Sequence, residues 1–253
     1  MKLTPQGVIK RVRFSTLSQG SPACGDPAVY GSQRPGINVA PAVSADDQTV
    51  YTISRAHFDP AHACLLAINA DLTSDWHSSL ITSGFAGYIE DNSSSSPSVA
   101  PDGSILYGAA GVDRGELMQF NSSGNYLTSY AFGWDLTPAI YAHDGTYSVI
   151  VKDNHYGGGP YYITQLNANL GTEWQFTSPT NEEWCVNAPA VDRSGSVYAD
   201  SEDGNVYAIK QGGTLKGKLF LKKAIGAAYT PIAIGRAGKL YTENDGVMFV
   251  LGK

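Results

Sequence analysis

The sequence predicts an all-β fold, a five-bladed β-propeller of four-stranded antiparallel blades, from a repeat, its period and the composition. Five times along the chain, a proline is followed nine or ten residues later by a tyrosine. Successive prolines lie 41 to 56 residues apart, the length of a four-stranded blade. Glycine (28 residues) and tyrosine (15) are abundant and only 16% of residues are charged, which suits many short strands joined by tight turns. The pairs are Pro41 with Tyr51, Pro97 with Tyr107, Pro138 with Tyr147, Pro189 with Tyr198 and Pro231 with Tyr241.

The clearest copy of the repeat runs from Asn187 to Gly213. Residues 187–191 form a short apolar strand, 192–195 a turn, and 196–200 an alternating second strand. Asp203-Gly204 is a strong hairpin signal because both residue types tolerate positive φ. A third strand at 205–209 and a fourth at 214–221 complete the predicted blade.

The whole chain is predicted to be one propeller domain, with blades at 38–80, 94–132, 135–177, 187–221 and 229–251. The last copy stops without a fourth strand, and residues 3–10 resemble the entry to an outer strand at 166–173. We therefore expect residues 7–15 to complete the fifth blade, since a closed ring leaves no unpaired edge. A piece of a longer propeller, cut in phase with the repeat, is the competing interpretation.

The repeat resembles the PQQ-type propeller repeat. The matching motifs are Pro189-Ala190-Val191, Gly195-Ser196-Val197-Tyr198, Asp203-Gly204-x-x-Tyr207-Ala208-Ile209, and outer strands with Trp76 and Trp174. The resemblance covers nearly the whole chain and implies the propeller fold. Family enzymes that hold the quinone generally have six or eight blades. With five repeats, no adjacent cysteine pair and tryptophan in only two outer strands, no cofactor is predicted.

Charge and hydropathy exclude some partners. A net charge of −6 and a pI near 5.3 argue against nucleic acid and anionic lipid. No run of 18 apolar residues occurs, so no membrane insertion is predicted, and we expect a monomer. The first residues lack the apolar core of a signal peptide, but low charge and many tyrosines and serines favour an extracytoplasmic setting over the cytoplasm. Cys24, Cys64 and Cys185 fit either one disulfide with a free thiol or three reduced thiols.

One face of the propeller is predicted to carry the binding residues. Connections between blades and those between second and third strands emerge on the same face, and the long loops of this chain belong to that set. Three polar inner-strand residues would line the central channel, where they bond either a ligand or ordered water. The predicted ligand-binding residues are His57, Trp134, His155, Tyr156 and Trp184 from the loops and Asn38, Asp135 and Asn187 from the inner strands.

These features predict a non-catalytic scaffold that binds a small molecule, a glycan or a protein. The alternative is an enzyme acting in the channel, either a carbohydrate-active hydrolase around Asp135 or a degenerate quinoprotein. A glycosidase needs two carboxylates, and only Asp135 lies on an inner strand, with Glu182 and Glu183 on a loop. The pattern His57-x-Asp59-x-x-His62-x-Cys64 has metal-binding residue types but no further partner, so neither a metal site nor catalytic residues are predicted.

Overall fold

The computed structural model describes residues 1–18, 24–36, 38–82, 85–86, 95–111, 114–133, 136–155, 158–184, 187–221 and 232–252. Apart from two helices of four residues, the regular structure of these residues is antiparallel β-sheet. No helix in this part of the chain has the length and apolar character that crossing a membrane requires.

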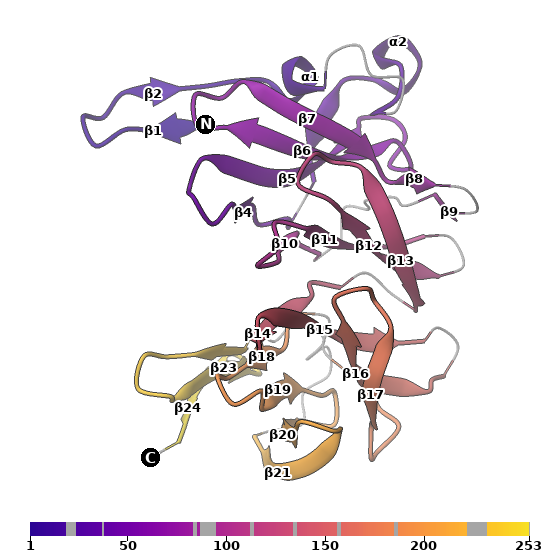
Figure 1. The fold of residues 1–253 in the computed structure, drawn as a ribbon, viewed down its shortest axis with the longest axis vertical. Coiled ribbons are helices and arrows are strands. Elements are labelled where there is room, and N and C mark those ends of the chain that lie inside the picture. The colour runs from indigo at the N-terminus through magenta and orange to yellow at the C-terminus, as the bar shows by residue number, and fades with distance from the viewer. Residues whose placement is uncertain are drawn as a thin grey trace.

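Each of the five repeats folds into its own sheet, and the strands follow one another in chain order (Figure 1). The first sheet comprises β3 (Gln33–Pro35), β4 (Ala42–Val43), β5 (Thr49–Ala56), β6 (Ala63–Asn69) and β7 (Ser74–Ser79). The second comprises β10 (Ser98–Val99), β11 (Ile105–Ala109), β12 (Gly115–Phe120) and β13 (Tyr126–Phe132). The third comprises β14 (Ala139–His143), β15 (Thr146–Asn154), β16 (Tyr161–Asn167) and β17 (Thr172–Thr177). The fourth comprises β18 (Ala190–Val191), β19 (Val197–Asp200), β20 (Asn205–Lys210) and β21 (Thr214–Phe220), and the fifth β22 (Ile232–Ile234), β23 (Leu240–Asn244) and β24 (Val247–Leu251).

The sheets succeed one another around an arc. Their inner strands β4, β10, β14, β18 and β22 contact one another in that order. In each of the first four sheets, the strand before the outermost one also shifts register near its end, at Ala67/Ile68, Gln119/Phe120, Gln165/Leu166 and Ala208/Ile209. A bulge that recurs at one place in four sheets is the structural counterpart of the sequence repeat.

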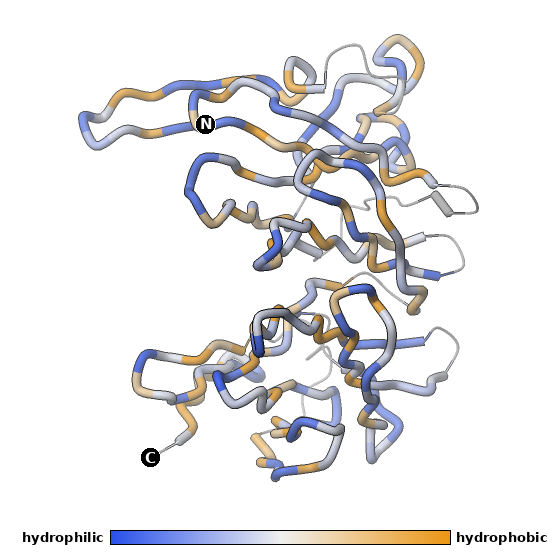
Figure 2. Tube along the Cα trace, viewed as in Figure 1, coloured by the Kyte–Doolittle hydropathy of each residue, from blue (hydrophilic) through white to orange (hydrophobic). Residues whose placement is uncertain are grey.

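The hydrophobic core lies between neighbouring sheets, because β5, β11, β15 and β19 are covered on both faces. Alternate residues of a strand point to opposite faces. Val149 and Val151 of β15 accordingly join the cluster shared with the second sheet, and Ile150 joins the cluster shared with the fourth. Figure 2 shows hydrophilic residues at turn tips such as that between β4 and β5 and a mixture of both kinds along the strands.

The N-terminal segment does not complete the fifth sheet, so the predicted closure by residues 7–15 is wrong. Instead, β1 (Lys2–Leu3) pairs with β2 (Ile9–Lys10), and β24 pairs with β23 alone among the described strands. Residues 12–17, which include the helix α1 (Phe14–Leu17), pack on Leu66 and Ile68 of the first sheet. The reason is that this face of the first sheet is apolar, and burying it outweighs pairing with a distant edge. Figure 1 shows the β1–β2 hairpin beside the first sheet and well away from β24.

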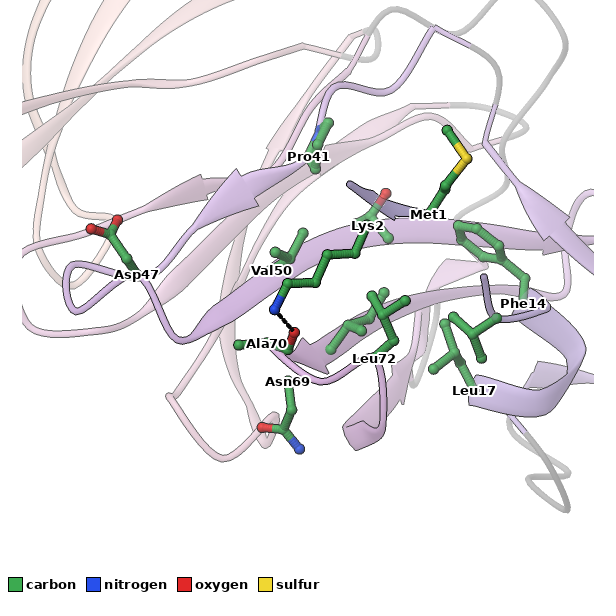
Figure 3. Close-up of a pocket in the computed structure, with 13 residues that line it drawn as sticks. Met1, Lys2, Phe14, Leu17, Pro41, Asp47, Val50, Asn69, Ala70 and Leu72 are labelled. Atoms are coloured by element: carbon green, nitrogen blue, oxygen red, sulfur yellow. Dashed lines mark hydrogen bonds between the residues drawn. The ribbon is translucent and has the colours of Figure 1, made fainter. Parts of the chain in front are cut away.

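The N-terminal segment covers this face incompletely. A cavity of about 430 Å³ remains between the segment and the first sheet (Figure 3). Its lining is mostly apolar, with Phe14 and Leu17 on one side and Val50 and Leu72 on the other. The Nζ atom of Lys2 donates a hydrogen bond to the carbonyl of Ala70 at 2.6 Å, which ties the segment across the cavity.

Candidate functional site on the loop-rich face

The two faces of the arc are built differently. On one face lie residues 57–62 between β5 and β6, the described residues 155 and 158–160 between β15 and β16, and the described residues 178–184 and 187–189 between β17 and β18. On the other face lie compact turns such as 100–104, 121–125 and 168–171, which are closed by local backbone hydrogen bonds. We call the first the loop-rich face; it includes the ends of β5 and β15.

The loop between β5 and β6 is held by the preceding connector. The helix α2 (Pro27–Tyr30) begins after Asp26, whose carboxylate accepts a hydrogen bond from the Ala28 amide at 2.8 Å. The carbonyl of Tyr30 accepts a hydrogen bond from the Phe58 amide at 2.8 Å. A Cβ atom at Gly31 would come within 2.9 Å of both His57 and Phe58, so the two segments are in close contact.

A disulfide joins the same two segments. Cys24 and Cys64 are bonded, with Cα atoms 5.6 Å apart across 40 positions of sequence. The Gln33 side chain donates hydrogen bonds to the carbonyls of Cys24 and His62. This pairing selects the one-disulfide alternative; the third cysteine, Cys185, lies outside the described residues.

Breaking this disulfide is expected to lower the free energy of unfolding by about 2–4 kcal/mol, because the bond restricts a long loop of the unfolded chain. Urea unfolding with and without a phosphine reductant measures the effect. The Cys24→Ser/Cys64→Ser variant should lose all response to the reductant, and Cys185→Ser should keep it. An unfolding midpoint that does not move on reduction would refute the stabilising role.

The connected segments expose a mixed surface, here called the stapled patch, of Val29, Arg34, His57 and Phe58. The side chains of Phe58 and Val29 are 72% and 62% exposed. The rings of His57 and Phe58 stack with centroids 4.4 Å apart, and the Arg34 guanidinium donates to His57 Nε2. The patch thus offers a fixed aromatic ring beside a cation.

The four residues of the pattern His57-x-Asp59-x-x-His62-x-Cys64 make other contacts in this loop. Cys64 is in the disulfide, His57 contacts Arg34, and His62 Nδ1 lies 3.2 Å from Asp59 Oδ2. The His62 ring also stacks on Tyr30 at 3.7 Å. These four donors do not converge on one point in the described structure.

The end of β15 carries three consecutive buried polar residues, Lys152, Asp153 and Asn154. Asp153 is wholly buried; its Oδ2 atom accepts hydrogen bonds from Tyr130 at 2.8 Å and Thr164 at 3.1 Å. Burial raises the pKa of Asp153, while the Tyr130 hydroxyl opposes the shift. Asp153 Oδ1 lies 3.0 Å from Nε2 of His155, whose side chain is 40% exposed. A buried carboxylate therefore orients a predicted site imidazole on the loop-rich face.

Trp184, one of the predicted ligand-binding residues, lies in the core and not on the surface. The residue is wholly buried and packs edge-on against Tyr207, with centroids 5.2 Å apart. Asn154 holds it in place: its side chain donates to the Trp184 carbonyl at 2.7 Å and accepts from the Trp184 amide at 3.0 Å. The connector folds over its own tryptophan because an indole buries a large apolar area.

A second buried carboxylate, that of Asp200, bonds the fourth sheet to the fifth. Asp200 of β19 accepts a hydrogen bond from Thr242 of β23 at 3.1 Å. Burial raises the pKa of Asp200 to about 6, against the opposing effects of the Lys152 ammonium and of Thr242. Lys152, Asp200 and Thr242 are 2%, 4% and 2% exposed. The hydrogen bond between Thr242 and Asp200 therefore joins the fifth sheet to the fourth inside the protein, and the Lys152 ammonium of the third sheet acts on Asp200 electrostatically.

The inner strands use their polar groups to join neighbouring sheets. The Ser96 hydroxyl accepts from the Ala40 amide at 2.9 Å, and the Thr137 hydroxyl accepts from the Ser96 amide at 2.8 Å. Asn38 is exposed and has φ of 60°, a turn conformation, and Asn187 is partly buried. Trp134, Asp135 and Tyr156 lie outside the described residues, so their predicted site roles, and the enzymatic alternative around Asp135, stay predictions.

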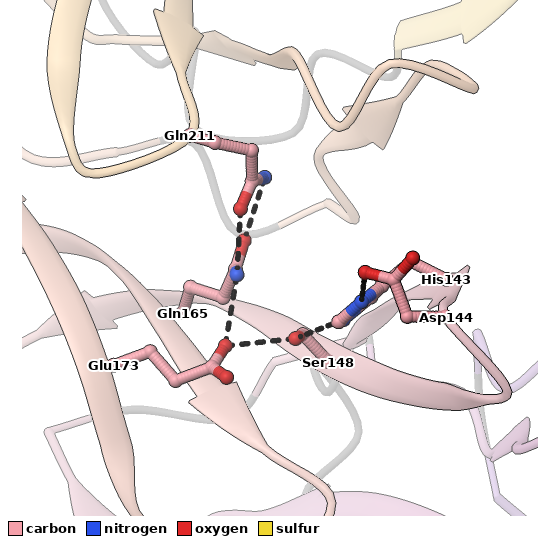
Figure 4. A network of polar contacts seen from close by, with 6 residues as sticks. All are labelled: His143, Asp144, Ser148, Gln165, Glu173 and Gln211. Atoms are coloured by element: carbon pink, nitrogen blue, oxygen red, sulfur yellow. Dashed lines mark hydrogen bonds and ion pairs between the residues drawn. The ribbon is translucent and has the colours of Figure 1, made fainter.

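A serine–histidine–aspartate arrangement occurs near the compact turns (Figure 4). His143 Nε2 lies 2.8 Å from Ser148 Oγ, and His143 Nδ1 lies 3.3 Å from Asp144 Oδ2. However, the wholly buried Ser148 donates its hydroxyl hydrogen to Glu173 at 2.7 Å. The imidazole must then donate to Ser148 and cannot act as its base. Gln165 extends this network to the fourth sheet through paired bonds with Gln211 at 2.9 and 3.0 Å.

Sequential antiparallel sheets arranged around an arc define a β-propeller. Comparison with solved structures finds propellers of similar fold. The BamB structure from Moraxella catarrhalis has 15% identity and a TM-score of 0.58, and the match covers 85% of this chain and 58% of that one. The Dos1 propeller matches with 15% identity, 83% and 56% coverage and a TM-score of 0.55. The C-terminal WD40 domain of Sif2 matches with 16% identity, 87% and 59% coverage and a TM-score of 0.58.

At these identities the likeness shows the fold alone. The match spans less than two thirds of each of these three chains. No protein-family model matches the sequence. No curated protein matches it either.

Proposed function

We propose that this β-propeller is a non-catalytic binding scaffold whose loop-rich face holds its partner. The stapled patch carries the proposal: an exposed phenylalanine and an exposed arginine lie on two segments that a disulfide joins. Rigid aromatic and arginine side chains supply much of the energy of protein interfaces. This favours a protein partner over a glycan or a small molecule. His57 belongs to this surface, and the exposed imidazole of His155 adds a second contact on the same face.

We further propose a five-bladed PQQ-like array that works as a monomer outside the cytoplasm. The five repeats and their five sheets support the array. The disulfide supports the compartment, since such bonds persist in oxidising environments.

Site-specific photo-crosslinking tests the binding role. A benzophenone-bearing phenylalanine replaces Phe58 on the loop-rich face or Leu127 at the start of β13, which is 51% exposed on the other side. We expect a specific adduct at position 58 and none at 127. The captured protein is then identified and purified, and its Kd is measured by calorimetry.

The Phe58→Ala/His155→Ala variant should weaken this purified complex at least about tenfold, as loss of an aromatic anchor does. Leu127→Ala should leave the Kd unchanged. Equal capture at both positions, or an affinity unaffected by Phe58→Ala/His155→Ala, would refute binding through the loop-rich face.

A further inference from the structure

The stapled patch specifies the chemistry of what it binds. Phe58 is the most exposed aromatic side chain among the large hydrophobic residues that the structure describes. Its backbone amide is bonded to Tyr30, its ring stacks on His57, and its loop is joined by the disulfide to the preceding connector. Because the ring is already fixed, little conformational entropy remains to be lost when a partner binds.

The charge beside this ring is positive. Arg34 projects from β3 and is exposed, and its guanidinium donates a hydrogen bond to Nε2 of His57, a group that carries no negative charge. The nearby carboxylates are already used. Asp26 caps α2, and Asp59 bonds the Ala61 amide at 2.9 Å and faces His62. Among the described residues, no carboxylate accepts a hydrogen bond from Arg34. The patch is therefore positively charged, although the whole chain has a net charge of −6.

We propose that the stapled patch binds a protein segment in which an aromatic side chain lies next to a carboxylate. The segment's ring packs on Phe58 and His57, and its carboxylate accepts two parallel hydrogen bonds from the Arg34 guanidinium. Val29 on α2 adds apolar area to the stapled patch. This inference rests on the proposed function and deepens it by naming the chemistry that the face selects.

Three small probes of nearly equal shape test the proposal on the isotope-labelled protein by NMR. They are 3-phenylpropionate, its uncharged amide 3-phenylpropanamide, and the cation phenethylamine. We expect saturable shifts of the Phe58 amide and the Arg34 Nε–H signals with 3-phenylpropionate. Affinity for the amide should be about tenfold lower, the usual worth of a charge-assisted pair, and the amine should cause no saturable shift.

Two exposed substitutions separate the ring from the charge. Arg34→Gln should remove the preference for the carboxylate over the amide while retaining ring contact. Phe58→Ala should abolish binding of both. Leu127→Ala is the matched control and should bind 3-phenylpropionate as the wild type does. The retained disulfide and an unchanged Tm show that each variant is folded.

Equal affinity for the three probes, or shifts that do not map to the patch, would overturn the proposal. Its failure is distinguishable from failure of the binding role. If photo-crosslinking at Phe58 captures a partner but the patch does not prefer 3-phenylpropionate, the scaffold function stands and the inferred partner chemistry is wrong. If the protein prefers 3-phenylpropionate over its amide and Arg34→Gln removes that preference, the inferred chemistry of the partner is supported.

Discussion

Lys152→Met is expected to lower the free energy of unfolding at neutral pH by about 1 kcal/mol, because the Asp200 carboxyl, whose pKa is about 6, takes up a proton once the ammonium is gone. Lys152 and Asp200 are 2% and 4% exposed, and the ammonium lowers the pKa of the carboxyl. Without it, only Thr242 counters the burial of Asp200. Urea unfolding at neutral pH measures the loss, and Lys210→Met, on an exposed lysine, should have almost no effect.

The loss should depend on pH in a defined direction. The pKa of Asp200 rises from 3.8 to about 6 in the fold, so the folded state holds this proton more tightly than the unfolded chain does. The stability that the group contributes is therefore full at low pH and is lost as the pH rises through about 6. Lys152→Met moves that pKa further upward, so the variant should differ less from wild type at pH values near 5 than at neutral pH.

A double-mutant cycle provides the control. Lys152→Met/Asp200→Asn removes both charges, so the double variant should be more stable at neutral pH than Lys152→Met alone. Strictly additive losses, or a Lys152→Met effect that is constant with pH, would contradict electrostatic coupling between the two residues.

Gly133→Ala should destabilise the protein by at least about 3 kcal/mol, at the upper end of overpacking effects. A Cβ atom at this position would lie 1.6 Å from the Asn154 carbonyl oxygen and 2.4 Å from the His155 Cα atom. Both neighbours are backbone atoms, so no side-chain rotation relieves the overlap. The end of β13 and the loop after β15 would have to separate, which disturbs the position of His155.

Gly217→Ala is the matched control. Gly217 lies in β21, and a Cβ atom there meets nothing within 4 Å. Thermal unfolding should give this variant a Tm close to that of the wild type and a much lower Tm for Gly133→Ala. A wild-type Tm for Gly133→Ala would mean that β13 does not approach Asn154 as described.

The sequence predicted most of the strand pattern because the repeat carries local signals. The copy from 187 to 221 is an example: the Asp203-Gly204 hairpin lies between β19 and β20 as predicted. Such turns depend on residues close in sequence. The prediction that residues 7–15 close the fifth sheet was wrong. The N-terminal segment could pack on the first sheet or pair with the fifth, and both lie far from it in sequence or in space. Its resemblance to the start of an outer strand does not decide between the two sheets.

The candidate site was predictable only in part. Loop position predicted His57 and His155, which the structure places on the loop-rich face, since long loops gather on one face of a propeller. Trp184 was misplaced because composition does not tell whether a loop folds over its aromatic residue. Phe58 was not predicted, because the sequence does not show whether a phenylalanine in a loop packs inward or, as here, stays 72% exposed.

The buried polar residues behind this face could not be inferred from sequence alone. Lys152 and Asp200 are 48 positions apart, and only the packing of consecutive sheets couples them. Alternation along β15 places Lys152 on the same side of the strand as Ile150. That Asp200 is the carboxylate on that side is known only from the fold.

Hydrogen exchange with the crosslinked and purified partner tests most directly that the loop-rich face is the working surface. Binding should slow amide exchange in residues 24–34 and 56–62 and leave the compact turns 121–125 and 168–171 unchanged. Protection confined to those turns, or to the inner strands β4, β10 and β14, would contradict this account.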